Sequence, residues 1–317
     1  MKQSHPLGLT PHGRILWRFL VLACCWSLVP FAEAQQSAAG GRVGIRSVVT
    51  TPERLVSGSP FLLTVVLDGK ASVVQGEWNH QQVFFWKAHS KAAGSEVWYA
   101  LAGVDVEVEP GHYALSVHAT RADGTTAESS KQIQVEAAHY RTTTLNVPEN
   151  FVEPDAAAQK EIAADKELKD RIFAKSAPEP EWAGEFARPV NAASTDSFGT
   201  RRVFNGKLAS IHRGMDFRAA SGTPVGASNA GTVVLARKLF YEGNLVVIDH
   251  GQGLATLYMH LSKIEVTEGQ RVRRRQRLGL SGSTGRVTGP HLHFAVRWQG
   301  GYLDPAGIFR LDLAGKP

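Results

Sequence analysis

Three short patterns in the last third of the chain carry side chains that bind metals and transfer protons. They are HRGMDF at 212–217, YMHL at 258–261 and GPHLHF at 289–294. Their metal-binding or proton-transferring residues are His212, Asp216, His260, His291 and His293. A catalytic zinc takes three protein ligands from imidazoles or carboxylates and leaves a fourth position for water. The patterns therefore predict a hydrolytic zinc site that contains His212, Asp216 and one histidine of the His-x-His pair.

The spacing within the patterns indicates which side chains share a face. Residues two apart point the same way on a β-strand, so His291 and His293 point together, while Leu292 points to the packed side. His212 and Asp216, four residues apart, share a face on an extended strand, which Gly214 favours over a helix. A lone His-x-His or His-x-x-x-Asp pattern is weak, but the two together favour a metal site. The remaining histidine of the pair and His260 would then act on the water or on the developing oxyanion.

The elements that must position these residues are predicted to be strands. After residue 185 glycine is dense, no segment is predicted to be helical, and strands are expected at Thr232–Ala236, Leu245–Asp249, Leu254–His260, Arg271–Leu280 and His291–Trp298. The front half has similar short runs at Phe61–Leu67, Val83–Trp86, Val97–Val104, Tyr113–Ala119 and Gln132–Val135. Turn signals such as Asp68-Gly69 separate the front runs, which is typical of an immunoglobulin-like sandwich.

Between the two β regions the composition changes. Residues 156–174 are rich in Ala, Glu, Lys and Asp, lack Gly and Pro, and follow Pro154-Asp155, a helix start. We predict a mainly β protein: signal peptide 1–34, immunoglobulin-like sandwich 35–147, helical connector and linker 148–184, and a strand-rich domain 185–317 that contains the three patterns. The apolar stripe of the helix is thin, so we expect a connecting role.

Composition and charge support two folded units in one exported chain. The 317 residues contain 43% hydrophobic and 20% charged residues, which excludes a disordered chain, a collagen and a polytopic membrane protein. Residues 35–184 have 14 basic and 19 acidic side chains, whereas residues 185–317 have 18 basic and 9 acidic ones. The opposite net charges, −5 and +9, indicate units with different tasks.

The first 34 residues have the order of a secretory signal. Basic residues precede the apolar stretch 19–31, and Ala32-Glu33-Ala34 fits a cleavage site with Gln35 as the mature start. The stretch is too short for a lasting transmembrane helix. Both cysteines, Cys24 and Cys25, lie inside it, so the mature chain has no disulfide or thiolate ligand. We expect a periplasmic or secreted protein, with lipoprotein anchoring at Cys24 the less favoured alternative.

HRGMDF, YMHL and GPHLHF, in that order, resemble the lysostaphin/LytM-type zinc metallopeptidases, which cut peptidoglycan peptides. The similarity covers residues 189–309 and includes GASNAGTVV at 226–234 and VVIDHG at 246–251. The resemblance implies an antiparallel β barrel-like domain that hydrolyses stem or cross-bridge peptides of peptidoglycan. It also implies that one zinc is held by His212, Asp216 and His293, and that His260 and His291 are the catalytic histidines.

Two further functions compete with this interpretation. Some relatives of this family have lost ligands and act as non-enzymatic wall-binding or amidase-activating factors, but all five matched positions are filled here. A general exported protease is the other alternative. The basic run 271–277 (Arg271, Arg273, Arg274, Arg275 and Arg277) is either a solvated strand face or a surface for anionic envelope polymers. Nucleic acid is not an expected partner of an exported chain. His250 and the segment Gly279–Ser283 are interpreted as structural.

Overall fold

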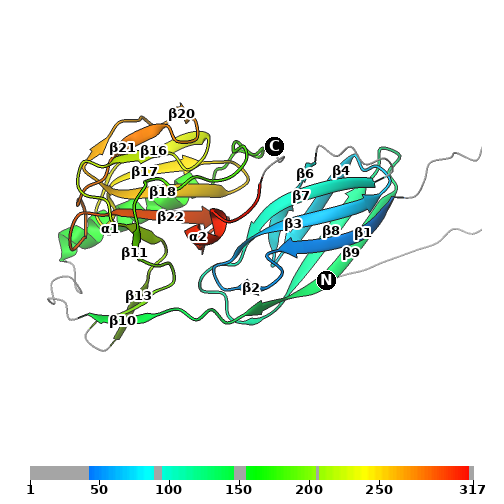
Figure 1. Cartoon of the computed structure of the whole chain (residues 1–317), viewed down its shortest axis with the longest axis horizontal. Helices are drawn as coiled ribbons and strands as arrows, with labels where there is room; N and C mark the ends of the chain where they lie inside the picture. Colours follow the sequence, from blue (N-terminus) through cyan, green and yellow to red (C-terminus); the bar gives the residue numbers. More distant parts are fainter. Residues whose placement is uncertain (1–42, 89–94, 146–154, 205–206, 314–317) are drawn as a thin grey trace, which may run out of the picture. The chain divides into compact units, whose positions relative to one another are not determined.

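The chain folds mainly into β-strands, as the sequence predicts (Figure 1). The computed structural model describes residues 43–88, 95–145, 155–204 and 207–313. The predicted signal peptide 1–34, with Cys24 and the mature start Gln35, lies outside these residues. Within the described residues, no helix is both long and apolar enough to cross a membrane.

Two antiparallel sheets with one parallel edge pair make up the front region. The first has the order β1-β3-β7-β6: β1 (Gly44–Thr51), β3 (Pro60–Asp68), β7 (Ser95–Gly103) and β6 (Trp86–Lys87). The second has the order β2-β9-β8-β4-β5: β2 (Leu55–Val56), β9 (Thr126–Glu136), β8 (Gly111–Thr120), β4 (Val73–Trp78) and β5 (Gln81–Phe84). The two sheets face each other, because Phe61 of β3 meets Trp78 of β4 edge-to-face at 5.3 Å. The immunoglobulin-like class of this sandwich stays a prediction.

One run that we predicted as a single strand in this region is two strands. Val83–Trp86 is divided between β5 and β6, which belong to different sheets. Alternation of apolar and polar residues could not show this division, because both pieces bury a side chain, Val83 and Trp86.

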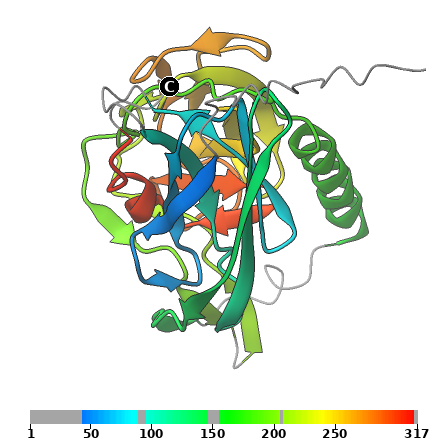
Figure 2. The same cartoon turned by 90° about the vertical axis from the view of Figure 1, so that its right-hand side faces the viewer.

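The predicted helix exists, and it covers a sheet of the C-terminal region (Figure 2). Helix α1 (Ala156–Phe173) begins at the N-cap Asp155, whose carboxylate accepts the N–H of Ala158. The thin stripe of Leu168, Ile172 and Phe173 packs on a cluster that includes Leu235 and Leu257 of the sheet beneath. Helix α1 is therefore part of the packing of the C-terminal region, beyond the connecting role that we expected.

An eight-stranded sheet is the main element of the C-terminal region. Its order is β11 (Ser194–Asp196), β14 (Met215–Phe217), β22 (Leu292–Trp298), β18 (Leu254–Leu261), β17 (Gly243–Asp249), β16 (Gly231–Leu239) and β20 (Arg271–Val272), and β23 (Gly301–Leu303) pairs with β22. Two three-stranded sheets accompany it: β10 (Thr142–Leu145), β12 (Arg201–Phe204) and β13 (Lys207–Ile211), and β15 (Pro224–Gly226), β21 (Arg277–Leu280) and β19 (Lys263–Ile264). Strand β18 is buried along nearly its whole length, whereas β22 has two half-buried side chains, His293 and Arg297, on one face.

Two predictions for the C-terminal region are wrong. Arg271–Leu280 is not one strand, because β20 and β21 lie in different sheets and a turn at 273–276 joins them. A short helix, α2 (Pro305–Ile308), is present where we predicted none. Its start has a recognisable signal, because Asp304 caps it and a proline occupies its first position.

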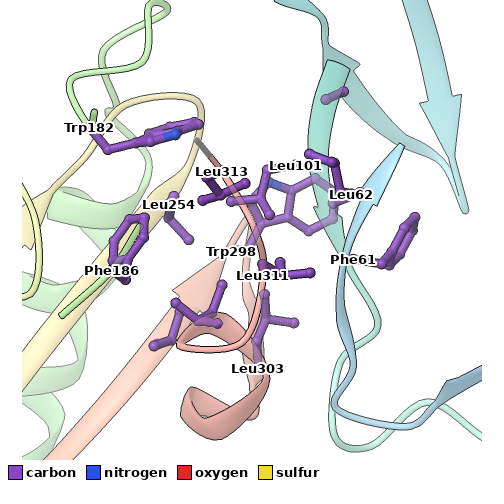
Figure 3. Close-up of a cluster of buried hydrophobic side chains, with 14 of the residues drawn as sticks. Phe61, Leu62, Leu101, Trp182, Phe186, Leu254, Trp298, Leu303, Leu311 and Leu313 are labelled. Carbon is purple, nitrogen blue, oxygen red and sulfur yellow. The ribbon is translucent and has the colours of Figure 1, made fainter. Parts of the chain in front are cut away.

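Apolar side chains of the front sandwich and of the C-terminal region belong to one buried cluster. Figure 3 shows Leu62 and Leu101 of the sandwich beside Trp298, Leu303 and Leu311. Backbone hydrogen bonds accompany this packing, since Val106 N–H donates to Tyr302 O at 3.2 Å. The domain boundaries at residues 147 and 184 remain a prediction.

Candidate metal centre

Three side chains from the predicted patterns converge on one point. His212 Nε2 lies 3.2 Å from Asp216 Oδ1 and 3.0 Å from His293 Nδ1, and His293 Nδ1 lies 2.8 Å from Asp216 Oδ1. Within the described residues these three form the one group of histidine and carboxylate donors close enough to hold a metal. All three are largely buried, with side-chain exposures of 3%, 12% and 13% for His212, Asp216 and His293.

Strand register brings two of the three donors together. Asp216 in β14 pairs directly with His293 in β22, so the two side chains lie on neighbouring strands of one sheet. His212 does not share a strand with Asp216 as we expected. It follows the end of β13, which belongs to another sheet, and a short connection through Arg213 and Gly214 leads into β14. The chain passes from one sheet to the other within the four residues that separate His212 from Asp216.

The ring of His212 is oriented by contacts at Nδ1, the nitrogen that does not face Asp216. Its Nδ1 lies 3.0 Å from the carbonyl of Ser197, and because a carbonyl can only accept, Nδ1 carries a proton and Nε2 is the nitrogen that faces Asp216 and His293. Asp196 Oδ2 lies 3.3 Å from the same Nδ1 and is itself bound by Arg202 at 2.9 Å. A carboxylate or carbonyl behind a histidine is the usual support of a metal ligand.

His260 reaches the site through an irregularity in β18. Between Asn244 and Val246, β17 has one residue, whereas the facing part of β18 has two, Met259 and His260. His260 has a positive φ of 63°, and its N–H donates to the carbonyl of Glu242 at 2.9 Å. This bulge re-aims the side chain, as bulges beside functional sites commonly do.

His260 and His291 are held in the same way. His260 Nδ1–H donates to the carbonyl of Thr284 at 2.9 Å, and His291 Nδ1–H donates to the carbonyl of Gly289 at 2.8 Å. In each ring Nε2 is left with its lone pair. The two rings lie 4.9 Å apart, and His291 Nε2 lies 3.7 Å from Asp216 Oδ1. The structure thus brings all five predicted residues together.

Burial sets the protonation states of the centre. Burial alone would raise the pKa of Asp216, but its interactions with His212 and His293 hold that pKa far below its usual range. Burial lowers the pKa of His293, with partial compensation from Asp216. Burial, with the charge of His293, lowers the pKa of His260 to about 3. Asp216 is therefore ionised and His293 is neutral, which are the states in which these two residues bind a metal.

The donor set fits zinc. Tetrahedral zinc with ligand distances of about 2.0–2.1 Å separates its ligand atoms by about 3.3 Å. The three separations here, 2.8–3.2 Å, are close to that value. Two imidazoles and one carboxylate match the ligand types of catalytic zinc. The imidazole of His291 also lies near Asp216, but three protein ligands are enough for a catalytic zinc, so His291 is not needed as a fourth.

Several predicted features lie apart from this centre. His250 is fully buried and bridges the carbonyl of Ala230 and the hydroxyl of Thr256, a structural role. Ser281 is buried too, and its hydroxyl donates to Ala220 O at 2.5 Å. A cavity of about 680 Å³ contains none of the five site residues, and its lining includes Arg188, Arg274, Arg275 and Arg277.

Residues 210–305 match peptidase family M23, and this span contains all five site residues. The chain carries a peptidase family M23 domain. A crystal structure of a putative peptidase M23 from Pseudomonas aeruginosa aligns with 81% of this chain and 95% of its own, at 26% identity and a TM-score of 0.60. The overall fold is therefore shared well beyond the M23 domain.

Two curated relatives resemble part of the chain. The identity is 56% over 90 residues to the peptidoglycan DD-endopeptidase ShyA of Vibrio cholerae, a match that covers 28% of this chain and 21% of ShyA. It is 43% over 98 residues to the DD-carboxypeptidase/endopeptidase Mpg of Neisseria meningitidis, which covers 31% of this chain and 23% of Mpg. The chain thus spans about a fifth of the length of these relatives.

Proposed function

We propose that this protein is an exported zinc-dependent endopeptidase that hydrolyses stem or cross-bridge peptides of peptidoglycan. The observation that carries the proposal is the convergence of His212, Asp216 and His293 beside His260 and His291, inside an M23 domain. One similar protein is named a peptidoglycan DD-endopeptidase and another a DD-carboxypeptidase/endopeptidase, which favours peptidoglycan as the substrate.

The five residues divide into ligands and proton-transfer groups. In this proposal one zinc is held by His212 Nε2, Asp216 Oδ1 and His293 Nδ1. Zinc supplies a Lewis acid and lowers the pKa of a bound water toward about 7. His260 and His291, each with Nδ1–H fixed on a carbonyl, keep Nε2 free to accept a proton or to hydrogen-bond a developing oxyanion.

A non-catalytic wall-binding or amidase-activating factor is the competing function. Such a factor needs a surface, and it has no need of two histidines fixed beside a metal site. Both His260 and His291 are positioned by backbone carbonyls, and a binding module does not require such fixed ring orientations. We therefore favour the enzyme.

We also propose that the basic run attracts anionic envelope polymers, with a narrower set of residues than the sequence indicated. Arg271 lies 3.6 Å from Glu181, and Arg277 is paired with Glu265 at 2.6 Å. Arg273, Arg274 and Arg275 are exposed and have no ion-pair partner among the described residues. Arg274 and Arg275 also line the 680 Å³ cavity, so their charges are available to an anion.

The proposed activity is tested by digesting purified sacculi with the full-length protein and analysing the released muropeptides by mass. We expect cross-linked dimers to be converted to monomers, and we expect a chelator to stop the conversion and added zinc to restore it. A protein that digests casein but leaves sacculi intact would be a general protease. A protein that binds sacculi without releasing muropeptides would be the wall-binding factor.

A further inference from the structure

Arg286 is a positive charge that stacks on an aromatic ring and has no ionic partner among the residues that the structure describes. Its guanidinium carbon lies 4.0 Å from the centre of the Tyr241 ring, a cation–π arrangement. Its backbone N–H donates to the carbonyl of Tyr241 at 3.0 Å. Arg286 is exposed, and the described residues provide no carboxylate that pairs with it. The side chain therefore has an ordered position and an unneutralised charge.

The segments that hold Arg286 are the same ones that hold His260. Residues 240–243 provide Tyr241 and also Glu242, whose carbonyl accepts His260 N–H. Residues 284–286 provide Arg286 and also Thr284, whose carbonyl accepts His260 Nδ1–H. The link is short, because Arg286 follows Thr284 by two residues.

The two segments are in direct backbone contact. A Cβ on Gly285 would lie 2.8 Å from the Cα of Gly243, so only glycine permits this approach. Asn244 N–H donates to Thr284 Oγ1 at 2.9 Å beside the crossing. His260 and Arg286 are thereby held by the same two contacting segments, which places Arg286 next to the part of the chain that fixes His260.

We propose that Arg286 binds a free carboxylate of the peptide substrate and so makes the site selective for acidic peptides. This inference rests on the proposed endopeptidase function. A guanidinium matches a carboxylate with two parallel hydrogen bonds, and stacking on Tyr241 fixes its plane before the substrate arrives. Peptides of peptidoglycan carry free carboxylates, and amidation removes their charge.

The test compares two peptide substrates that differ only in one group, a carboxylate or a carboxamide, with zinc-loaded full-length protein. We expect wild type to prefer the carboxylate by roughly tenfold to hundredfold in kcat/KM, the range for a hydrogen bond to a charged group. Arg286→Gln should abolish this preference, with the loss falling on the carboxylate peptide. Arg286→Lys should keep a small part of it, because lysine retains charge but not the planar fork.

Lys238→Gln is the matched control, because it removes one exposed positive charge from the nearby end of β16 and leaves Arg286 in place. It should retain the wild-type preference. The proposal is overturned if wild type does not distinguish the two peptides or if Arg286→Gln still prefers the carboxylate. Equal losses of kcat/KM on both peptides would also overturn it, because they would show that Arg286 only supports the segments that hold His260.

Failure of the proposed function gives a different result. If zinc-loaded wild type cleaves neither peptide, binding of both peptides is measured by calorimetry with wild type and Arg286→Gln. A carboxylate preference that disappears in the variant still supports the Arg286 site, and equal binding of both peptides by wild type overturns it.

Discussion

Replacing Gly214 with alanine should weaken metal binding by steric displacement of one ligand. A Cβ at this position would lie 2.6 Å from the carbonyl oxygen of Phe294 and closer still to His293 Nε2. Favourable contacts begin at about 3.5 Å, so relief requires a shift of about 1 Å. Metal sites tolerate deviations of only about 0.2 Å in ligand distances.

The expected result is a loss of roughly tenfold to hundredfold or more in zinc affinity, by comparison with the effect of disturbing a ligand's support. Titration of the apoprotein with zinc against a competing chelating dye measures it. Gly289→Ala is the control, since a Cβ there meets nothing within 4 Å although Gly289 also lies beside a site histidine. If Gly214→Ala binds zinc as tightly as Gly289→Ala, His293 is not held against Gly214 as a ligand.

Three further predictions follow from the site and its surroundings. His260→Ala and His291→Ala should each retain zinc yet lose about 10²-fold or more in kcat, and near-normal turnover with either would remove that residue from the chemistry. Burial lowers the pKa of His250 to about 4 from 6.5. The unfolded state therefore binds the extra proton between these values, and the free energy of unfolding should fall by up to about 3 kcal/mol as the pH drops from about 6.5 to about 4. His250→Gln should remove that part of the slope in urea unfolding, and an unchanged slope would contradict it. Arg273→Glu with Arg275→Glu should weaken sacculus binding at low salt and leave small-peptide hydrolysis unchanged, and wild-type binding by that variant would show that the run is only solvated surface.

Local patterns indicated the five residues that the structure brings together. The His291/His293 pair depends only on the two-residue period of a strand, and β22 has that period, with Leu292 and Phe294 fully buried. Asp216 and His212 were found by type and spacing, although the reason that we gave, a shared strand face, is wrong. The order of the three patterns along the chain supported the resemblance to the zinc metallopeptidases.

The supports of the site were not predictable, because they depend on contacts between distant segments. Asp196 lies beside His212 through the pairing of β11 with β14, and no motif marks it. The bulge at His260 arises from a register shift between β17 and β18, which alternation alone does not reveal. The turn that divides the arginine run places Arg275 at a φ of 65°. Arginine rarely adopts this left-handed conformation, so its presence did not indicate a turn.

The proposed metal centre is tested most directly by a zinc titration of chelator-treated protein, with hydrolysis of a cross-linked peptidoglycan peptide as the readout. We expect no activity without metal, a rise to a plateau at one zinc per chain, and no activity at any zinc concentration for Asp216→Ala. Undiminished activity in the metal-free protein, or zinc-restored activity in the Asp216→Ala variant, would contradict the assignment of His212, Asp216 and His293 as the metal centre.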